Sequence, residues 1–244
     1  APDAIVHLAA ISNVPFAAEH PELAREVNVT GLVNILDAVR ACGRDIQVVN
    51  ASSVEVFAPH DGLINEESPL GGMSVYAQTK QAALTLARTS DLAVANVLMS
   101  NHESPLRTTA FVTGKIAAGV AAISRDKSQV LTLGNIDVHR DWSAAQDIVE
   151  GMVRVLERRF IGDVILASGI TRPLRELVVA AFASVGIADW ERYVEFDRAL
   201  FRSEAPSRHL DVTKALRELD WTATTPVEQW MSEMVASFGD QSRA

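Results

Sequence analysis

The chain has 244 residues, of which 48% are hydrophobic, and its formal net charge is −9, a composition typical of a globular protein with one large α/β domain or a domain and a small lobe. The acidic balance argues against a nucleic-acid-binding surface, and the apolar runs are too short to span a membrane, so neither partner is expected. The single cysteine, Cys42, excludes an internal disulfide framework and favours a reducing, cytoplasmic location.

The first hundred residues alternate between apolar runs and helical patterns. Residues 4–10, 46–52 and 92–99 are apolar runs of the kind that form buried parallel strands. Between them, helices are predicted from Pro21 to just before Gly43, and from Ser74 onward. This order predicts an α/β fold with a Rossmann-like, doubly wound parallel sheet that has helices on both faces.

Beyond residue 100 the pattern becomes more mixed. Residues 101–105 predict a polar loop, and residues 139–142 are assigned only to the approach to a helix. Short strands are predicted at 130–133 and 164–167, and helices at 109–123, 144–158, 173–185 and from 226. We therefore expect residues 101–244 to form mostly a smaller lobe, with some elements returning to the main sheet.

Two short motifs are candidates for chemistry. Tyr76 and Lys80 are four residues apart and lie one helical turn from each other. A Lys ammonium beside a Tyr hydroxyl favours the phenolate, which predicts that Tyr76 acts as a general base or acid near neutral pH. Ser53 and Glu55 follow the second strand, where open α/β sheets bind ligands. The plainer alternatives are a surface Tyr/Lys pair and a solvated carboxylate at a strand end.

These residues resemble the extended short-chain dehydrogenase/reductase family of nucleotide-sugar enzymes, the NAD-dependent epimerases and dehydratases. The general family features are Leu8-Ala9-Ala10 with Ser12, the segment Asn28-Val29-Thr30-Gly31, and the set Ser53, Tyr76 and Lys80. Within that family the chain looks most like the GDP-mannose 4,6-dehydratases. This narrower resemblance rests on Asn101-His102-Glu103-Ser104-Pro105, Phe111-Val112-Thr113 with Lys115-Ile116, and Gly134-Asn135 with Arg140-Asp141-Trp142.

The resemblance implies a reaction and a role for each catalytic residue. GDP-mannose would be converted to GDP-4-keto-6-deoxymannose by internal hydride transfer through NADP, with NAD as the alternative cofactor. Tyr76, with Lys80 beside it, would take the proton of the sugar O4, and Ser53 would hydrogen-bond the reacting hydroxyl. Glu55 would remove the C5 proton and help water to leave from C6. No metal is expected.

The resemblance also implies binding residues, domains and partners. The residues implied for the cofactor are Leu8, Ala9, Ala10, Ile11, Ser12, Tyr76, Lys80, His102 and Arg107. Those implied for the nucleotide-sugar substrate are Asn101, Glu103, Lys115, Arg140, Arg202 and Glu204. Residues 1–100 would be the remainder of the dinucleotide-binding domain with the catalytic Ser, Tyr and Lys, and 101–244 mostly the substrate-binding lobe. The family suggests a homodimer or homotetramer.

The chain departs from the family pattern in several respects, and three of them bear on function. Val54 replaces a usually polar residue beside Glu55, which predicts a weaker C6 step, and Gly114 replaces an Arg, which removes a cation near the ligand. The glycine-rich turn that binds the dinucleotide pyrophosphate is absent from this sequence. Two strand–helix units before Ala1 would add roughly 60 residues. A chain that truly began at Ala1 should bind NADP poorly and lack activity.

Two other functions compete with the dehydratase hypothesis. A nucleotide-sugar reductase or epimerase of the same family needs Tyr76 and Lys80 but not Glu55. A non-catalytic homologue or fragment would serve as an assembly partner, and the absent glycine-rich turn and Val54 favour this alternative somewhat.

Overall fold

A four-stranded parallel sheet organises the larger part of the molecule. The computed structural model describes residues 2–59, 62–201 and 208–240. The strands are β1 (Ala4–His7), β2 (Gln47–Ser53), β4 (Val94–Met99) and β8 (Gly162–Leu166), and they lie side by side in the order β1-β2-β4-β8. Every neighbouring pair is parallel, which confirms the predicted Rossmann-like sheet.

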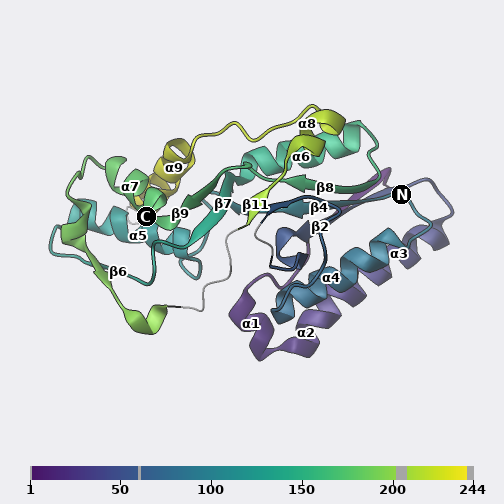
Figure 1. The fold of residues 1–244 in the computed structure, drawn as a ribbon, viewed down its shortest axis with the longest axis horizontal. Coiled ribbons are helices and arrows are strands. Elements are labelled where there is room, and N and C mark those ends of the chain that lie inside the picture. The colour runs from purple at the N-terminus through teal and green to yellow at the C-terminus, as the bar shows by residue number, and fades with distance from the viewer. Residues whose placement is uncertain (1, 60–61, 202–207, 241–244) are drawn as a thin grey trace.

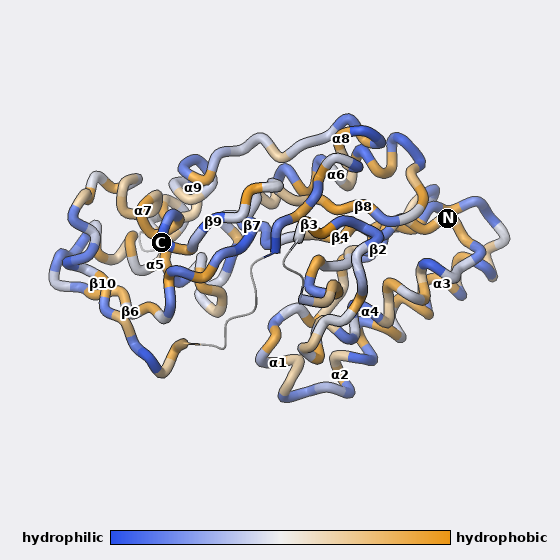
Figure 2. The backbone as a smooth tube through the Cα atoms, in the orientation of Figure 1, coloured by the Kyte–Doolittle hydropathy of each residue, from blue (hydrophilic) through white to orange (hydrophobic). Residues whose placement is uncertain are grey.

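Helices cover both faces of this sheet. On one face lie α3 (Gly31–Cys42) and α4 (Val75–Arg88), and on the other lie α6 (Ala145–Glu157) and α8 (Thr213–Leu219) (Figure 1). Separate buried clusters fill the two sides, one around Val48 and Leu36 and the other around Val97 and Ile148. Because β2 and β4 are covered from both sides, β2 is buried along its whole length and β4 along nearly all of it, and β4 is mostly apolar (Figure 2).

The segment between β1 and α3 is helical along most of its length. It contains α1 (Val14–Glu19), α2 (Pro21–Arg25) and a π-helical turn (Glu26–Thr30) that continues into α3. The sequence predicted a helix only from Pro21, so α1 was not predicted. It begins after Asn13, whose side chain accepts a hydrogen bond from the Phe16 amide at 3.0 Å.

The second lobe has its own core. Its helices are α5 (Val112–Arg125), α7 (Leu174–Ala183) and α9 (Val227–Asp240), and its main sheet is β5 (Asn101–Glu103), β7 (His139–Ala144) and β9 (Thr171–Pro173) in that order. A two-stranded sheet joins β6 (Leu131–Leu133) to β10 (Val194–Phe196). Trp142, Phe182 and Trp230 are buried in this core. The lobe lies beside the C-terminal ends of the large-sheet strands (Figure 1).

Two predictions for the second lobe were wrong. The expected polar loop at 101–105 begins with strand β5, and residues 139–142 are part of β7 rather than a lead-in to a helix. β7 pairs in parallel with β5 and antiparallel with β9. These polar segments become strands because tertiary pairing outweighs their weak local pattern.

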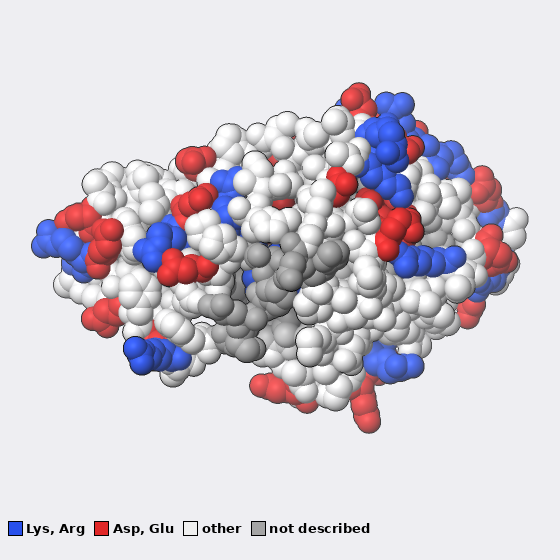
Figure 3. Space-filling model, in the orientation of Figure 1, with Lys and Arg blue, Asp and Glu red and all other residues white. Residues whose placement is uncertain are grey.

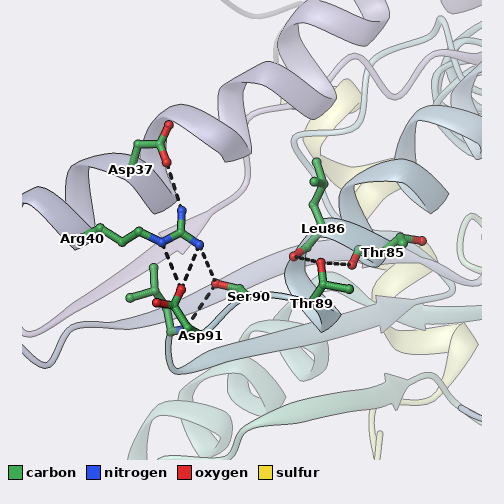
Figure 4. A network of polar contacts seen from close by, with 8 residues as sticks. Asp37, Arg40, Thr85, Leu86, Thr89, Ser90 and Asp91 are labelled. Atoms are coloured by element: carbon green, nitrogen blue, oxygen red, sulfur yellow. Dashed lines mark hydrogen bonds and ion pairs between the residues drawn. The ribbon is translucent and has the colours of Figure 1, made fainter.

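A short strand pair and a surface ion-pair cluster connect segments that are distant in the sequence. Strand β3 (Leu63–Ile64) pairs with β11 (His209–Leu210) in a separate two-stranded sheet, and Ile64 and Leu210 are buried in one cluster with Leu98 of β4. On the surface, Arg40 of α3 contacts Asp37 at 3.0 Å and Asp91 at 2.9 Å (Figure 4). Exposed ion pairs of this kind contribute little to the free energy of unfolding.

The face drawn in Figure 3 carries Lys and Arg interspersed with Asp and Glu, without a broad field of one sign. Within the described ranges, none of the helices combines the length and the apolar character needed to cross a lipid bilayer.

Candidate active site

Three of the predicted catalytic side chains meet at the C-terminal end of β2. Ser53 is the last residue of that strand, and Glu55 lies in the 3₁₀ turn (Val54–Val56) that follows. The Ser53 hydroxyl accepts a hydrogen bond from the Glu55 amide at 3.2 Å and is also hydrogen-bonded to the Tyr76 hydroxyl. Tyr76 stands in the first turn of α4, which Ser74 caps by accepting a hydrogen bond from the Ala77 amide at 3.1 Å.

The electrostatics of Tyr76 differ from the sequence-based prediction. Burial raises the pKa of the Tyr76 hydroxyl above its ordinary value, the hydrogen bond with Ser53 opposes this, and the nearby Glu55 carboxylate raises it further. The expectation that Lys80 favours the phenolate was therefore wrong for the protein by itself. In this state the hydroxyl is a proton donor at neutral pH.

Lys80 is buried below the same edge of the sheet. Its ammonium donates a hydrogen bond of 2.8 Å to the carbonyl oxygen of Ala51 in β2. Burial lowers the pKa of Lys80 to about 8. Burial also lowers the pKa of His7 at the end of β1, and the charge of Lys80 lowers it further. The amine of Lys80 thus lies near the ends of the first two strands, where a ligand of this fold would lie.

The loop after β1 is held by a residue that was noted only as a family feature. Asn28 in the π-helical turn accepts a hydrogen bond from the Ile11 amide at 2.7 Å and donates to the Ile11 carbonyl at 3.1 Å. It also donates to the Thr79 hydroxyl at 2.9 Å. Leu8, Ala9 and Ser12 of this loop are exposed, whereas Ala10 and Ile11 are partly buried. The sequence signal that could have identified this positioning role is a polar Asn between the apolar Val27 and Val29 of the predicted helix.

Several polar residues that follow β4 bind one another. Glu103 is buried and contacts Arg107 at 2.7 Å, and it accepts a hydrogen bond from Thr113 at 2.7 Å. Arg107 also donates to the carbonyl of His102 and lies over the ring of Phe111. Glu103 and Arg107, predicted to contact substrate and cofactor respectively, bind each other here.

Asn101 and His102 are fixed by the neighbouring strand ends. The Asn101 amide donates to the carbonyl of Asp141 at 3.1 Å, and His102 Nδ1 lies 2.9 Å from the carbonyl of Ser100. Asp141 is buried and accepts hydrogen bonds from the Ser100 hydroxyl at 2.8 Å and the Ser168 amide at 3.0 Å. Burial raises the pKa of Asp141, which these hydrogen bonds oppose.

The two predicted phosphate-binding cations that the structure describes lie in the second lobe. Lys115 is in the first turns of α5 and has no ion-pair partner among the described residues. Arg140 is in β7 and donates to the His139 carbonyl at 2.7 Å. Arg202 and Glu204, predicted to bind the same ligand, lie outside the described residues.

Arg208 is a further charged residue at the site and is not among the predicted site residues. Its guanidinium contacts the Glu55 carboxylate at 3.0 Å and donates to the Phe57 carbonyl at 3.4 Å. No local pattern could have found this pair, because 153 residues separate its members.

The residues present fit one end of a nicotinamide dinucleotide. The exposed Leu8 and Ala9 provide a surface at the end of β1, and Lys80 supplies a buried cation beside it. The glycine-rich turn that holds the pyrophosphate in this fold is not in the sequence. Within residues 2–59, 62–201 and 208–240, no three His, Cys, Asp or Glu side chains gather as metal ligands.

Most of the chain matches one family of known proteins. The family model described as GDP-mannose 4,6 dehydratase matches residues 1–234. A GDP-mannose 4,6 dehydratase of Drosophila melanogaster is 32% identical over 96% of this chain and 65% of its own length. GDP-mannose 4,6 dehydratase 1 of Arabidopsis thaliana is 33% identical over 96% of this chain and 67% of its own. The chain thus spans about two thirds of these relatives.

The fold is similar to that of solved structures. The structure of RMD from Pseudomonas aeruginosa complexed with NADPH superposes with a TM-score of 0.89, covering 98% of this chain and 82% of the other. The two sequences are 24% identical, so this likeness supports the fold alone.

Proposed function

Since the chain belongs to the GDP-mannose 4,6 dehydratase family, we propose that it is the larger part of a nucleotide-sugar 4,6-dehydratase that converts GDP-mannose to GDP-4-keto-6-deoxymannose. The observation that carries this proposal is the meeting of Ser53, Glu55 and Tyr76 at the end of β2. A carboxylate beside a Ser/Tyr pair supplies a second proton-transfer group, which a dehydration needs and a simple oxidation does not.

The chain's own residues would move protons at three sugar atoms. Tyr76 would take the proton of O4 when C4 is oxidised, which requires that ligand binding lower its raised pKa, and Ser53 would orient that hydroxyl. The resulting 4-keto group acidifies the C5 hydrogen, so the Glu55 carboxylate is a sufficient base. The proton that Glu55 removes leaves with the C6 oxygen as water. A bound NADP, or NAD as the alternative, would accept the C4 hydride and return it to C6.

Binding is assigned to both parts of the molecule. We assign residues 1–100 to the cofactor-binding domain, in which Leu8 to Ser12 and Lys80 line the nicotinamide end. Lys115 and Arg140 in residues 101–244 suit the diphosphate of the substrate. Asn101, Arg202 and Glu204 are proposed substrate contacts, and His102 a cofactor contact. We propose that the ion pair of Glu103 and Arg107 stabilises the segment that follows β5. We also propose that the protein is cytoplasmic and forms a homodimer or homotetramer.

The main alternative is a nucleotide-sugar reductase or epimerase. It is favoured by one observation, namely that Arg208 already pairs with Glu55, as in a purely structural ion pair. Replacing Glu55 by Gln separates the two functions. A dehydratase should lose most of its turnover, whereas a reductase or epimerase should keep it.

The first test uses protein expressed from the complete gene, with its N-terminus confirmed by intact mass. Incubation with GDP-mannose and NADP⁺ should produce a nucleotide sugar lighter by one water, with no net accumulation of NADPH. Glu55→Gln should abolish this product, and the exposed Glu67→Gln should serve as the matched control. Bound dinucleotide without this product would favour the alternative, and no dinucleotide binding would favour a non-catalytic homologue.

A further inference from the structure

Arg208 is a buried cation beside the proposed base. Its side chain is 9% exposed, and Glu55 is the carboxylate that contacts it, at 3.0 Å. Removing a guanidinium from water is costly unless its charge is paired. An apolar side chain of similar volume would pack at such a place without that cost. The position of this Arg therefore calls for an explanation beyond stability.

The backbone and the side chain of Arg208 are both held in place. The Thr171 hydroxyl of β9 donates to the Arg208 carbonyl at 2.9 Å, and the next residues pair with β3. A second guanidinium nitrogen donates to the Phe57 carbonyl at 3.4 Å, just beyond the turn that carries Glu55. The Arg208 Nε atom is buried without a partner among the described residues. The guanidinium is thus a rigid support rather than a mobile surface charge.

The two carboxylate oxygens of the partly exposed Glu55 side chain differ in their contacts. Its Oε1 atom receives the Arg208 hydrogen bond, and Oε2 has no partner among the described residues. A glutamate with three rotatable bonds would otherwise sample several positions at a strand end. The ion pair restricts this freedom and leaves one oxygen available to a ligand.

From this geometry we propose that Arg208 is the positioning residue of the Glu55 carboxylate and directs its free oxygen to the sugar C5, an inference that rests on the proposed dehydratase function. In the elimination, the C5–H bond breaks and its proton moves to Glu55. The electron pair forms the C5–C6 double bond as the C6–O bond breaks, and the proton leaves with that oxygen as water. No electron leaves the sugar in this step, and Arg208 keeps its charge throughout.

The test compares Arg208→Met, Arg208→Lys, Glu55→Gln and the double variant Glu55→Gln/Arg208→Met in protein from the complete gene. Arg88→Met is the matched control, because Arg88 also contacts a carboxylate, Asp163 at 2.6 Å, and a backbone carbonyl, that of Glu66, at 3.1 Å. Three quantities are measured, namely kcat and KM for water loss, the single-turnover oxidation at C4, and the exchange of the C5 hydrogen with deuterated water.

We expect Arg208→Met to lower kcat by about 10²-fold, because misplacing a reacting group by 1 Å has effects of that size. KM and C4 oxidation should change little, C5 exchange should fall with kcat, and Arg208→Lys should restore part of the loss. The double variant should be no slower than Glu55→Gln, because Arg208 acts through Glu55. Arg88→Met should retain wild-type kcat.

Other outcomes overturn the inference in distinguishable ways. An Arg208→Met protein with normal kcat, with loss confined to KM, or with equal loss of C4 oxidation and C5 exchange would contradict the positioning role. Additive losses in the double variant would show a separate structural role. A wild-type protein that binds dinucleotide and does not release water from GDP-mannose would instead remove the proposed function, and this inference with it.

Discussion

The side-chain amide of Asn28 donates a hydrogen bond of 2.9 Å to the hydroxyl of Thr79. Through this contact the π-helical turn before α3 is joined to α4, immediately before Lys80. The same amide binds both backbone groups of Ile11, so the loop after β1 is held to the helix that carries Tyr76. One buried side chain thus aligns the proposed cofactor loop with the proposed catalytic helix.

Replacing Asn28 by Ala should damage both stability and activity. The substitution leaves the Ile11 amide and carbonyl without their partner in a largely buried place, which should lower the free energy of unfolding by about 1–3 kcal/mol. Urea denaturation measures this effect, and kcat should fall with it. Asn65→Ala, in an exposed turn, is the control. An unchanged urea midpoint in Asn28→Ala would contradict the aligning role.

Because of Lys80, the free energy of unfolding should change with pH in the alkaline range. The pKa of Lys80 is about 8 in the folded protein and about 10.5 when unfolded, so between these values the unfolded chain binds more protons. The free energy of unfolding should therefore rise from pH 8 to pH 10, by up to about 3 kcal/mol. The raised pKa of Tyr76 acts in the opposite direction only above about pH 10.

The substitution Lys80→Met should flatten this rise, because Met carries no charge to bury. Chemical denaturation at several values between pH 7 and pH 10 measures the slope. The exposed Lys127→Met protein should keep the wild-type slope. If Lys80→Met and wild type showed the same slope, Lys80 would not be a buried amine with a lowered pKa.

Tyr76→Phe should abolish the proton transfer at O4 while leaving the fold intact. General acid–base groups contribute about 10²–10⁴-fold to rate, so kcat should fall within that range. The phenol ring remains packed, and only the hydrogen bond with Ser53 is lost. Steady-state kinetics and thermal melting measure the two effects. A Tyr76→Phe enzyme with more than half of the wild-type kcat would exclude Tyr76 from the chemistry.

Gly114 and Gly31 should respond in opposite directions to replacement by Ala. A Cβ at Gly114 would lie 2.2 Å from the Thr108 carbonyl oxygen, whereas a Cβ at Gly31 would make an ordinary contact of 3.9 Å with His7. Overpacking at residue 114 should cost about 1–3 kcal/mol. Gly31→Ala should gain up to about 1 kcal/mol from helix propensity. Thermal melting of both proteins tests this contrast, and equal shifts would contradict it.

The same close approach explains a departure from the family pattern. An Arg at position 114 would need the backbone near Thr108 to move, because its Cβ has no space there. Restoring the family's Arg by Gly114→Arg should therefore destabilise the protein rather than supply a ligand-binding cation.

The large sheet was predictable because its signals are local. Strand β2 is buried along its whole length and carries the apolar residues Val48 and Val49, and α4 begins directly after its capping residue Ser74. The positions of Ser53, Glu55 and Tyr76 followed from that order. Strand β7 was missed because its polar residues, such as Arg140, become strand only by pairing with β5 and β9.

The electrostatic environment of the site residues could not be predicted from the sequence. The raised pKa of Tyr76 depends on burial, and the contact of Arg208 with Glu55 joins distant parts of the chain. Likewise, nothing in the local pattern indicated that Glu103 and Arg107 would bind each other. A spacing of four fits both an internal pair and two ligand contacts, and only the fold distinguishes them.

The most direct test of the central claim is the fate of the C4 hydrogen. GDP-mannose carrying deuterium at C4 is incubated with NADP⁺ and protein from the complete gene, and the product is analysed by mass spectrometry and NMR. Internal hydride transfer with loss of water predicts that the deuterium is retained and lies on the C6 methyl group. Deuterium recovered in free reduced dinucleotide, or remaining at C4, would contradict the 4,6-dehydratase account.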